Sequence, residues 1–353
     1  MKEKSLKEIS WNVTEEQYRM DTALSYSTLA KFERQGFNDL DKLFDKVESP
    51  SLTFGSAVDS IITGGQEEFD SRFMVAEFPP TPDSIIKIVK QLFAEYGKEE
   101  ACRTFDNIPN INAKLLLLAE DFNYQPNWRP ETRVKVIKEK GTDYYNLLYI
   151  AGDRTILDTA TYQDVCNAVE ALRNSEATSY YFANNNPFEP NIERLYQLKF
   201  KATLNDIDYR CMADLLYVDY EKKIIIPIDL KTSGHSEWDF YKSFIDWSYQ
   251  IQSRLYWRII RANLDNDPYF KDFKLCNYLF IVVNKKTLTP LVWECPFTKE
   301  IGTLYFGKNK QIELRDPERI GMELNYYLNK KPDVPVGISK VKANNLKDWI
   351  DKL

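Results

Sequence analysis

Three side chains near the middle of this 353-residue chain have the types and spacing that phosphate chemistry requires. Asp214 lies in one β-rich run, and Asp229 and Lys231 lie two residues apart in the next. Facing carboxylates repel each other, so a fold that brings them together commonly binds a hard divalent ion between them. A neighbouring lysine can orient a metal-bound water or stabilise negative charge on a phosphate. The three residues therefore predict hydrolysis at a Mg²⁺ or Mn²⁺ centre.

An antiparallel hairpin would position these side chains. Its two runs, 209–218 and 224–231, flank a short charged turn centred between Glu221 and Lys222. With that centre, Asp214 lies directly opposite Asp229, about 5 Å away at Cβ. Lys231 shares a face with Asp229, because strand side chains alternate with a period of two.

Two further segments are expected beside the hairpin. A strand over 195–202 ends at the two-residue turn Asn205-Asp206, and this turn places Gln197 opposite Asp214. After the hairpin, the residues Tyr249, Gln252 and Tyr256 have helical spacing, which puts the three side chains on one helix face.

Taken in order, the series D…DxKT…YxxQxxxY resembles the PD-(D/E)XK nuclease superfamily, its RecB-type branch, and within it the RecE-like phage exonucleases. The resemblance implies an α/β fold: a restriction-endonuclease-like core with a mixed central sheet flanked by helices, plus an N-terminal helical part. It also implies the site roles: metal ligands Asp214, Asp229 and the Leu230 carbonyl, the catalytic lysine Lys231, the phosphate-side residues Gln252 and Tyr256, and Thr232 and Tyr249 as further candidates.

The chain departs from that family at three positions. Asp59, in Phe54-Gly-Ser-Ala-Val-Asp59, replaces a histidine ligand, and an aspartate is a harder ligand suited to Mg²⁺ or Mn²⁺. Gln197 replaces a glutamate, which weakens a further carboxylate ligand. Met212 replaces an arginine, for which Arg210 on the same strand face could substitute. The plainer interpretations are that Asp59 is a solvated helix residue and Gln197 a polar strand residue.

Other features bound the function. An Asp-x-Lys alone is common at a solvated strand end, and the net charge of −6 is unfavourable for nucleic-acid binding, which depends on phosphate neutralisation. An acidic outer surface can still coexist with a basic groove. The most promising source of basic charge is a set of residues between 87 and 140, although solvated helix faces explain most of them: Lys87, Lys90, Lys98, Arg129, Lys135, Lys138 and Lys140.

Composition excludes several classes of site. The five cysteines are scattered, which excludes a zinc ribbon and departs from the iron-sulfur members of the RecB-type branch. The one histidine, His235, leaves little for a His-based catalytic triad. No signal peptide and no apolar run long enough for a bilayer are present, so the expected location is the cytoplasm of a bacterium or phage-infected host, with no membrane partner.

We therefore expect a metal-dependent DNA exonuclease of phage-type recombination or replication. The alternative is a non-catalytic nucleic-acid-binding or partner-binding protein that retains the fold. The expected parts are an N-terminal helical region with an insertion (1–190), a nuclease core (191–300) and a C-terminal helix and tail (301–353), which together form one decorated domain. Expected partners are linear duplex or single-stranded DNA ends, a single-strand annealing protein, and further copies of the chain in a ring.

Overall fold

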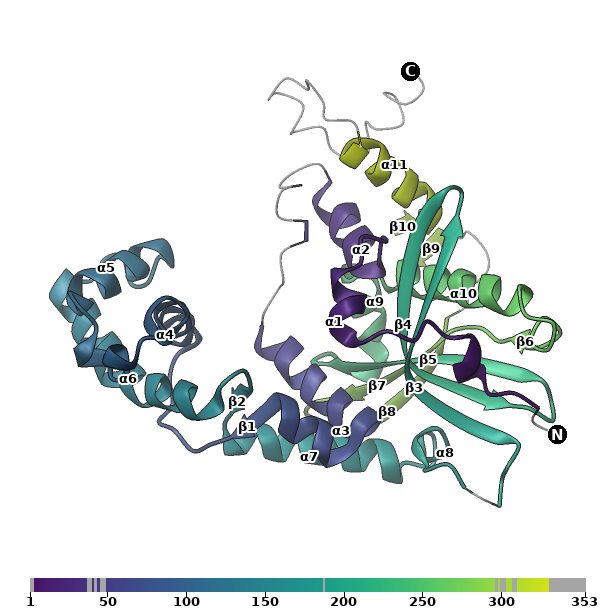
Figure 1. The fold of residues 1–353 in the computed structure, drawn as a ribbon, viewed down its shortest axis with the longest axis horizontal. Helices are drawn as coiled ribbons and strands as arrows, with labels where there is room; N and C mark the ends of the chain where they lie inside the picture. Colours follow the sequence, from purple (N-terminus) through teal and green to yellow (C-terminus); the bar gives the residue numbers. More distant parts are fainter. Residues whose placement is uncertain are drawn as a thin grey trace. The chain divides into compact units, whose positions relative to one another are not determined.

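The described part of the chain is built on a six-stranded mixed sheet (Figure 1). This computed structural model describes residues 3–36, 40, 43–44, 49–186, 188–295, 298, 303–306 and 310–329. The main strand order is β3-β4-β5-β7-β8, and β6 pairs with the start of β5. The strands are β3 (Ile192–Leu204), β4 (Ile207–Asp219), β5 (Ile224–Ser233), β6 (Lys274–Leu275), β7 (Leu279–Asn284) and β8 (Pro290–Glu294).

Along this order one pair of neighbouring strands is parallel, and the other pairs are antiparallel. β3, β4 and β5 are antiparallel neighbours, β5 and β7 run parallel, and β7 and β8 form an antiparallel hairpin. Parallel strands end at the same edge of a sheet, so the ends of β5 and β7 at Ser233 and Asn284 lie side by side. With its flanking helices, this sheet confirms the expected α/β class.

Both predicted hairpins have the expected register. Asn205 and Asp206 have φ values of 50° and 60°, the left-handed conformation that a tight two-residue turn requires. In the second hairpin, the pairing of Leu215 with Ile228 continues to the pairing of Asp219 with Ile224. The residue pairing of β3, β4 and β5 thus follows from turn chemistry that is local in the sequence.

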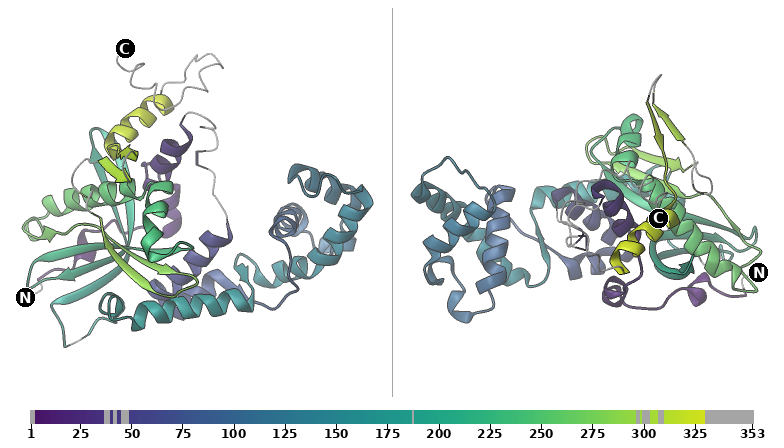
Figure 2. Two further views of the ribbon diagram at one scale, coloured as in Figure 1. Left: turned by 180° about the vertical axis from the view of Figure 1, so that it is seen from behind. Right: turned by 90° about the horizontal axis from the view of Figure 1, so that it is seen from above.

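The described ranges also contain helices, some of which flank the sheet (Figure 1, Figure 2). The helices are α1 (Glu15–Met20), α2 (Tyr26–Gln35), α3 (Pro50–Arg72), α4 (Asp83–Tyr96), α5 (Ile111–Asp121), α6 (Pro130–Ala151), α7 (Thr159–Asn174), α8 (Ser179–Phe182), α9 (Phe240–Asp246), α10 (Tyr249–Asp265) and α11 (Pro317–Asn329). Short 3₁₀ turns occupy Leu6–Ile9, Glu100–Cys102, Phe105–Asn107 and Glu237–Asp239. Two small sheets pair β1 (Phe73–Val75) with β2 (Thr155–Leu157), and β9 (Thr303–Phe306) with β10 (Lys310–Glu313).

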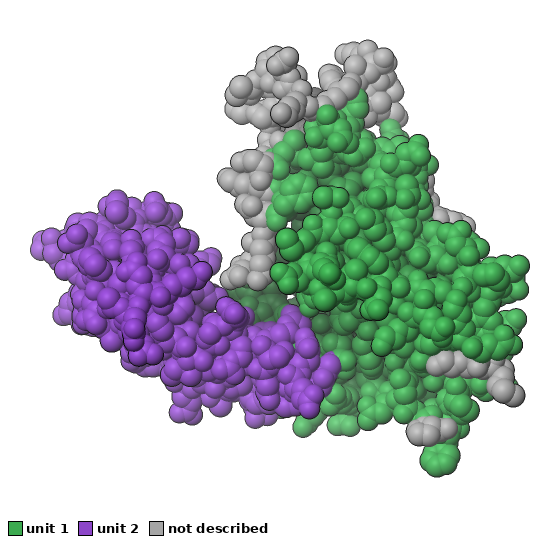
Figure 3. Space-filling view, in the orientation of Figure 1, with its two compact units in different colours: residues 1–63, 167–353 green, residues 64–166 purple. Residues whose placement is uncertain are grey.

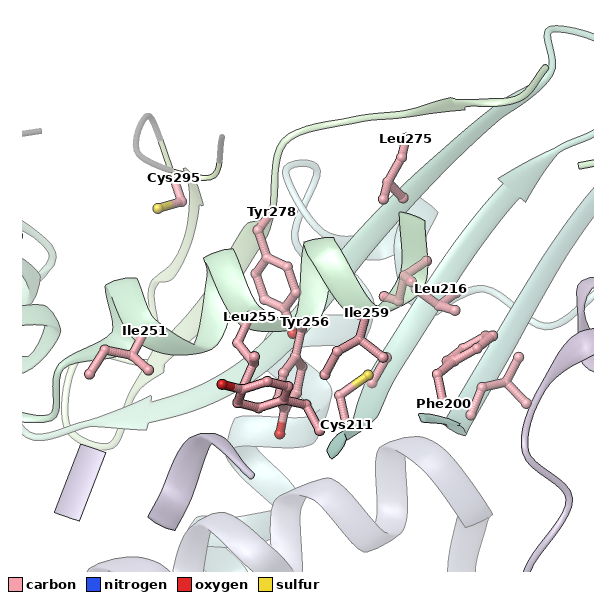
Figure 4. Close-up of a cluster of buried hydrophobic side chains, with 14 of the residues drawn as sticks. Phe200, Cys211, Leu216, Ile251, Leu255, Tyr256, Ile259, Leu275, Tyr278 and Cys295 are labelled. Atoms are coloured by element: carbon pink, nitrogen blue, oxygen red, sulfur yellow. The ribbon is translucent and has the colours of Figure 1, made fainter. Parts of the chain in front are cut away.

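Helix α10 packs on β3 and β4 and contributes a row of buried side chains to the core of this region (Figure 4). Its apolar face, including Leu255 and Ile259, is fully buried against Phe200, Cys211 and Leu216 of the sheet. Burial of apolar side chains is the main stabilising contribution in such a layer. This packing fixes the rotation of α10 and so determines which of its polar residues face the strands.

The chain divides into two compact units, coloured separately in Figure 3. The sheet unit comprises 1–63 and 167–353, and the helical unit comprises 64–166. The helical unit packs α4, α5 and α6 around its own core, which includes Ile88, Leu115 and Tyr145. The first division falls in α3, where Gly65 has a φ of 75° and interrupts the helical backbone. The expected boundaries near 190 and 300 do not coincide with this division.

Part of the helical unit has a composition typical of strands. Residues 134–138 and 144–147 are rich in β-branched and aromatic side chains, a pattern that predicts strands, but both segments lie in α6. At helical spacing, Ile137, Tyr144 and Tyr145 face the same buried core. Gly141 lies between them, and a Cβ there would approach Val89 Cγ2 of α4 to 2.7 Å. Tertiary packing therefore outweighs the local preference for strands.

No helix in the described ranges is both long enough and apolar enough to cross a membrane.

Candidate functional site

Asp214 on β4 and Asp229 on β5 lie at the point where the two strands stop pairing. The ladder ends with Leu215 opposite Ile228, so the two aspartates occupy the next position along the hairpin. The backbone N–H of Leu230 donates a 2.9 Å hydrogen bond to Oδ2 of Asp214. The N–H and C=O of one strand residue point to the same side, so the Leu230 carbonyl also points toward β4. The predicted ligands Asp214, Asp229 and the Leu230 carbonyl therefore lie close together.

Lys231 is held as a cation beside Asp229. Its ammonium forms an ion pair with Oδ2 of Asp229 and lies 4.8 Å from the ring centre of Tyr249. Burial by itself lowers the pKa of the lysine, but the negative charge of Asp229, together with Tyr249 and Asp214, raises the pKa above its usual value. Lys231 therefore carries its positive charge throughout the neutral range.

Helix α10 presents the three expected side chains toward these strands. Gln252 donates a hydrogen bond from Nε2 to Oδ1 of Asp229, and Tyr249 lies under Lys231. The ring of Tyr256 is buried, and burial raises its pKa well above the usual value, with further contributions from Asp229 and Asp214. The predicted spacing of the three residues is thus found on one helix face next to the carboxylates.

Asp59 of α3 approaches the same cluster. Gln197 of β3 donates from Nε2 to both carboxylate oxygens of Asp59, at 3.3 and 3.2 Å. The negative charge of Asp59 also contributes to the raised pKa of Asp214. Asp59, Gln197 and Asp214 therefore lie close together.

Gln197 has an unusual backbone. Its φ of 54° lies in the left-handed region, which is uncommon for residues other than glycine. The β3–β4 ladder pairs Tyr196 with Leu215 and Leu198 with Ala213 but omits Gln197 and Asp214 between them. Such conformations persist where surrounding structure holds them, and they concentrate at functional sites. The interruption of the ladder lies at Asp59, Asp214 and Asp229, which together form the acidic cluster.

Helix α3 reaches the sheet through Gly55. A Cβ at Gly55 would lie 3.0 Å from Oγ1 of Thr232, the residue after Lys231. Glycine allows this close approach, which brings α3 and Asp59 onto the site. Thr232 therefore contacts the supporting helix.

The donor chemistry of the cluster suits a hard metal ion. Burial raises the pKa of Asp214 well above the usual value, and the charges of Asp229 and Asp59 raise it further. Two buried polar atoms nearby, Oε1 of Gln252 and the hydroxyl of Tyr278, have no hydrogen-bond partner among the described residues. Carboxylate and carbonyl oxygens are the ligands that Mg²⁺ prefers. A divalent cation would therefore relieve repulsion that Lys231 and the Leu230 N–H compensate only in part.

These carboxylates do not, however, form a preassembled metal site. Within the described ranges, no group of three or more histidine, cysteine, aspartate or glutamate side chains is arranged to hold a metal ion. Both oxygens of Asp229 contact nitrogen donors, and both oxygens of Asp59 accept hydrogen bonds from Gln197. The three-carboxylate metal centre stays a prediction.

Several candidate residues lie away from the cluster. Arg210 is engaged with Asp21 and lies over the ring of Tyr18, so it does not join the acidic residues. His235 lies in the exposed loop after β5, and its carbonyl accepts a hydrogen bond from Asn284. Of the aromatic residues between β5 and α10, Phe240 and Phe244 of α9 are buried core residues, whereas Trp238 is 89% exposed.

The helical unit is also a poor source of basic charge. It contains 12 lysines and arginines against 17 aspartates and glutamates, whereas the sheet unit contains 35 against 36. Most of the net negative charge of the chain thus belongs to the helical unit, and the region of the acidic cluster belongs to a nearly neutral unit. The lysines between 87 and 140 do not make the helical unit electropositive.

Two tyrosines were not assigned to the site by sequence reasoning. Burial raises the pKa of Tyr26 of α2, and the charges of Lys231 and Asp229 also act on it. Its hydroxyl donates a 2.7 Å hydrogen bond to the Trp247 carbonyl. Tyr278 has a pKa raised by burial and then by Asp229. Both are ordinary aromatic residues in the sequence, and only the fold brings them near the carboxylates.

No family model and no curated protein matches the chain. The chain is similar to the crystal structure of a protein from Eubacterium rectale named as a candidate exonuclease, with 14% sequence identity and a TM-score of 0.41. The match covers 94% of this chain and 99% of the other. At that similarity neither the activity nor the site residues of that protein carry over to this chain.

Proposed function

We propose that this chain is a metal-dependent deoxyribonuclease that hydrolyses phosphodiester bonds at the cluster of Asp214, Asp229 and Lys231. The observation that supports it best is the raised pKa of Asp214, which has two other carboxylates close enough to contribute. Grouping of like charges in a partly buried site destabilises a protein, so it indicates a ligand that compensates the charge.

Each residue has a role that follows from its chemistry. Asp214, Asp229 and the Leu230 carbonyl would hold Mg²⁺ or Mn²⁺, with Asp59 as an additional ligand, and the ion would supply an activated water and polarise the phosphate. Lys231, as a permanent cation, stabilises negative charge on the phosphate oxygens. Gln252 orients Asp229 through its amide hydrogen bond. Tyr256 supports the same carboxylates from the buried side.

The exonuclease activity and the role in phage-type recombination or replication extend this proposal. They rest on the sequence series D…DxKT…YxxQxxxY. The same resemblance suggests linear duplex or single-stranded ends as substrate, and a ring of several copies or an annealing protein as partners.

The test uses purified full-length chain with end-labelled linear duplex and covalently closed circular DNA. In Mg²⁺ or Mn²⁺, we expect degradation of the linear duplex from its ends, survival of the circles, and no cleavage in EDTA. Nicking of the circles at a comparable rate would indicate an endonuclease rather than an exonuclease. Absence of cleavage of every DNA form with either metal would overturn the proposal and favour a protein that binds without cutting.

A further inference from the structure

One face of helix α3 runs along the sheet edge where the parallel strands β5 and β7 end. Ser51, Gly55 and Asp59 are four residues apart and therefore share that face. Each of these residues approaches a different segment. Ser51 approaches the residue after β7, Gly55 approaches the end of β5, and Asp59 approaches the strand β3. At 1.5 Å rise per residue, about 12 Å separates the first position from the third. Ligands of open α/β sheets bind at this kind of edge.

Lys285, the residue that follows β7, supplies a cation at the Ser51 end of that line. Its ammonium lies 3.3 Å from Oγ of Ser51 and 4.5 Å from the ring centre of Phe54, both on α3. Its backbone N–H donates a 3.1 Å hydrogen bond to the carbonyl of Ser233 at the end of β5. The side chain is half-buried. Its contacts with α3 and the backbone hydrogen bond to the end of β5 hold the residue in place.

The charge of Lys285 is not neutralised by the described part of the chain. No carboxylate there lies within ion-pair distance of it, in contrast to Lys231, whose ammonium contacts Asp229. Burial lowers the pKa of Lys285, and no acidic group within the described ranges opposes that effect. A partly desolvated cation that is held in place without a counterion is favourable for binding an external anion.

We propose that Lys285 binds a backbone phosphate of the nucleic-acid strand in the site, next to the phosphate that is hydrolysed. This inference rests on the proposed function, because it takes DNA as the substrate. The separation along α3 places Lys285 too far from Asp59 to act on the same phosphate. Contacts from lysine ammonium and serine hydroxyl groups to phosphates fix the register of a strand without reading its sequence. Lys285 is thus a positioning residue, and Ser51 is its neighbouring hydroxyl donor.

The salt dependence of binding separates this role from simple packing against Phe54. The logarithm of the binding constant falls with the logarithm of salt concentration by about 0.9 for each phosphate contact on duplex DNA. Lys285→Met keeps the aliphatic stem over Phe54 and removes only the charge. Lys285→Arg keeps the charge. Lys286→Met is the matched control, because Lys286 is the next residue and is exposed.

The experiment measures duplex binding by fluorescence anisotropy, with Ca²⁺ in place of Mg²⁺, at several salt concentrations. We expect Lys285→Met to bind several-fold more weakly and to lower the magnitude of the slope by about 0.9, while Lys285→Arg and Lys286→Met keep the parent slope. The inference would be overturned if the salt-dependence slope of Lys285→Met equals that of the parent, or if Lys286→Met lowers the slope by the same amount.

Cleavage assays on the same proteins distinguish the two proposals. If the parent cleaves in Mg²⁺ but the parent and Lys285→Met have equal salt-dependence slopes, only the proposed role of Lys285 is wrong. If the parent binds DNA and never cleaves, the nuclease proposal fails, and the slopes still decide whether Lys285 contacts phosphate. Equal melting temperatures for the variants show that each is folded.

Discussion

The backbone N–H of Leu230 donates a hydrogen bond to Oδ2 of Asp214, across the two strands of the central hairpin. This bond stabilises the carboxylate, but burial and the charges of Asp229 and Asp59 outweigh it, and the pKa of Asp214 is raised. The position of Asp214 thus opposes stability despite the neighbouring cation of Lys231.

Asp214→Asn should therefore stabilise the metal-free protein at neutral pH. Asparagine keeps an oxygen for the Leu230 N–H and removes the repelled charge, and one unit of pKa shift corresponds to about 1.4 kcal/mol. Because the folded-state pKa is raised, the parent loses stability as pH rises from about 4 through that pKa. The advantage of the variant should be small near pH 4 and grow toward neutral pH.

Urea unfolding in EDTA at several pH values measures this difference. Asp272→Asn is the control, since Asp272 is exposed. If Asp214→Asn is less stable than the parent at pH 7, the negative charge of Asp214 is well compensated within the protein.

Asp59 should take part in the metal response. A ligand that binds only the folded state raises the melting temperature, so Mg²⁺, Mn²⁺ and Ca²⁺ should each stabilise the parent. Asp59→Ala should reduce that shift and the cleavage rate, and Asp59→His should retain Mn²⁺-supported cleavage better than Mg²⁺-supported cleavage, because imidazole suits softer ions. Thermal-shift titrations measure the first effect, with Asp70→Ala as a control on the exposed face of the same helix. An unchanged metal response in Asp59→Ala would limit the site to the strand carboxylates.

The left-handed backbone of Gln197 should be detectable as strain. A non-glycine residue in this region costs about 1–2 kcal/mol, and glycine avoids most of that penalty. Gln197→Gly and Gln197→Ala both remove the donor to Asp59, so the two variants differ mainly in backbone strain. We expect the glycine variant to be more stable than the alanine variant by about 1 kcal/mol in urea unfolding. Equal stabilities would show that the conformation is not strained.

Asp316 should contribute strongly to stability. Burial favours a higher pKa for it, but the hydrogen bonds and charge of Arg258, with Arg254, outweigh burial and lower the pKa. Arg254 is fully buried, so Asp316→Asn would leave a buried cation uncompensated and cost about 2–3 kcal/mol at pH 7. Because the folded-state pKa is lowered, the parent should lose the same stabilisation as pH falls below about 4, through that folded-state pKa.

Denaturant unfolding from pH 3 to pH 7 tests this dependence. Asp265→Asn is the matched control, because Asp265 pairs with Arg261 on the exposed side of α10. An exposed pair contributes less than about 1 kcal/mol. Equal losses for the two variants would contradict a buried network around Arg254.

The sequence predicts the strand pairing well, because the deciding signals are local. Turn residues between β3 and β4 and between β4 and β5 set the register that aligns Gln197, Asp214 and Asp229. The helical spacing of Tyr249, Gln252 and Tyr256 predicts their common face in the same way.

Features that depend on distant parts of the chain are not predictable in this manner. The strand-like composition of α6 is overridden by packing on α4, which Gly141 makes possible. The left-handed φ of Gln197 has no signal in the residue type, and the proximity of Lys285 to α3 depends on contacts between segments more than 200 residues apart.

Catalysis at Lys231 is tested most directly by the rate of cleavage of an end-labelled linear duplex in Mg²⁺ and in EDTA. Lys231→Met removes the cation beside Asp229, and Lys222→Met removes an exposed lysine at the opposite end of the same hairpin. We expect metal-dependent cleavage by the parent and by Lys222→Met, and a rate at least about 100-fold lower for folded Lys231→Met, since one lost electrostatic group of this kind costs about that factor. Cleavage by folded Lys231→Met at the parent rate, or parental cleavage that persists in EDTA, would contradict a metal-dependent site at these residues.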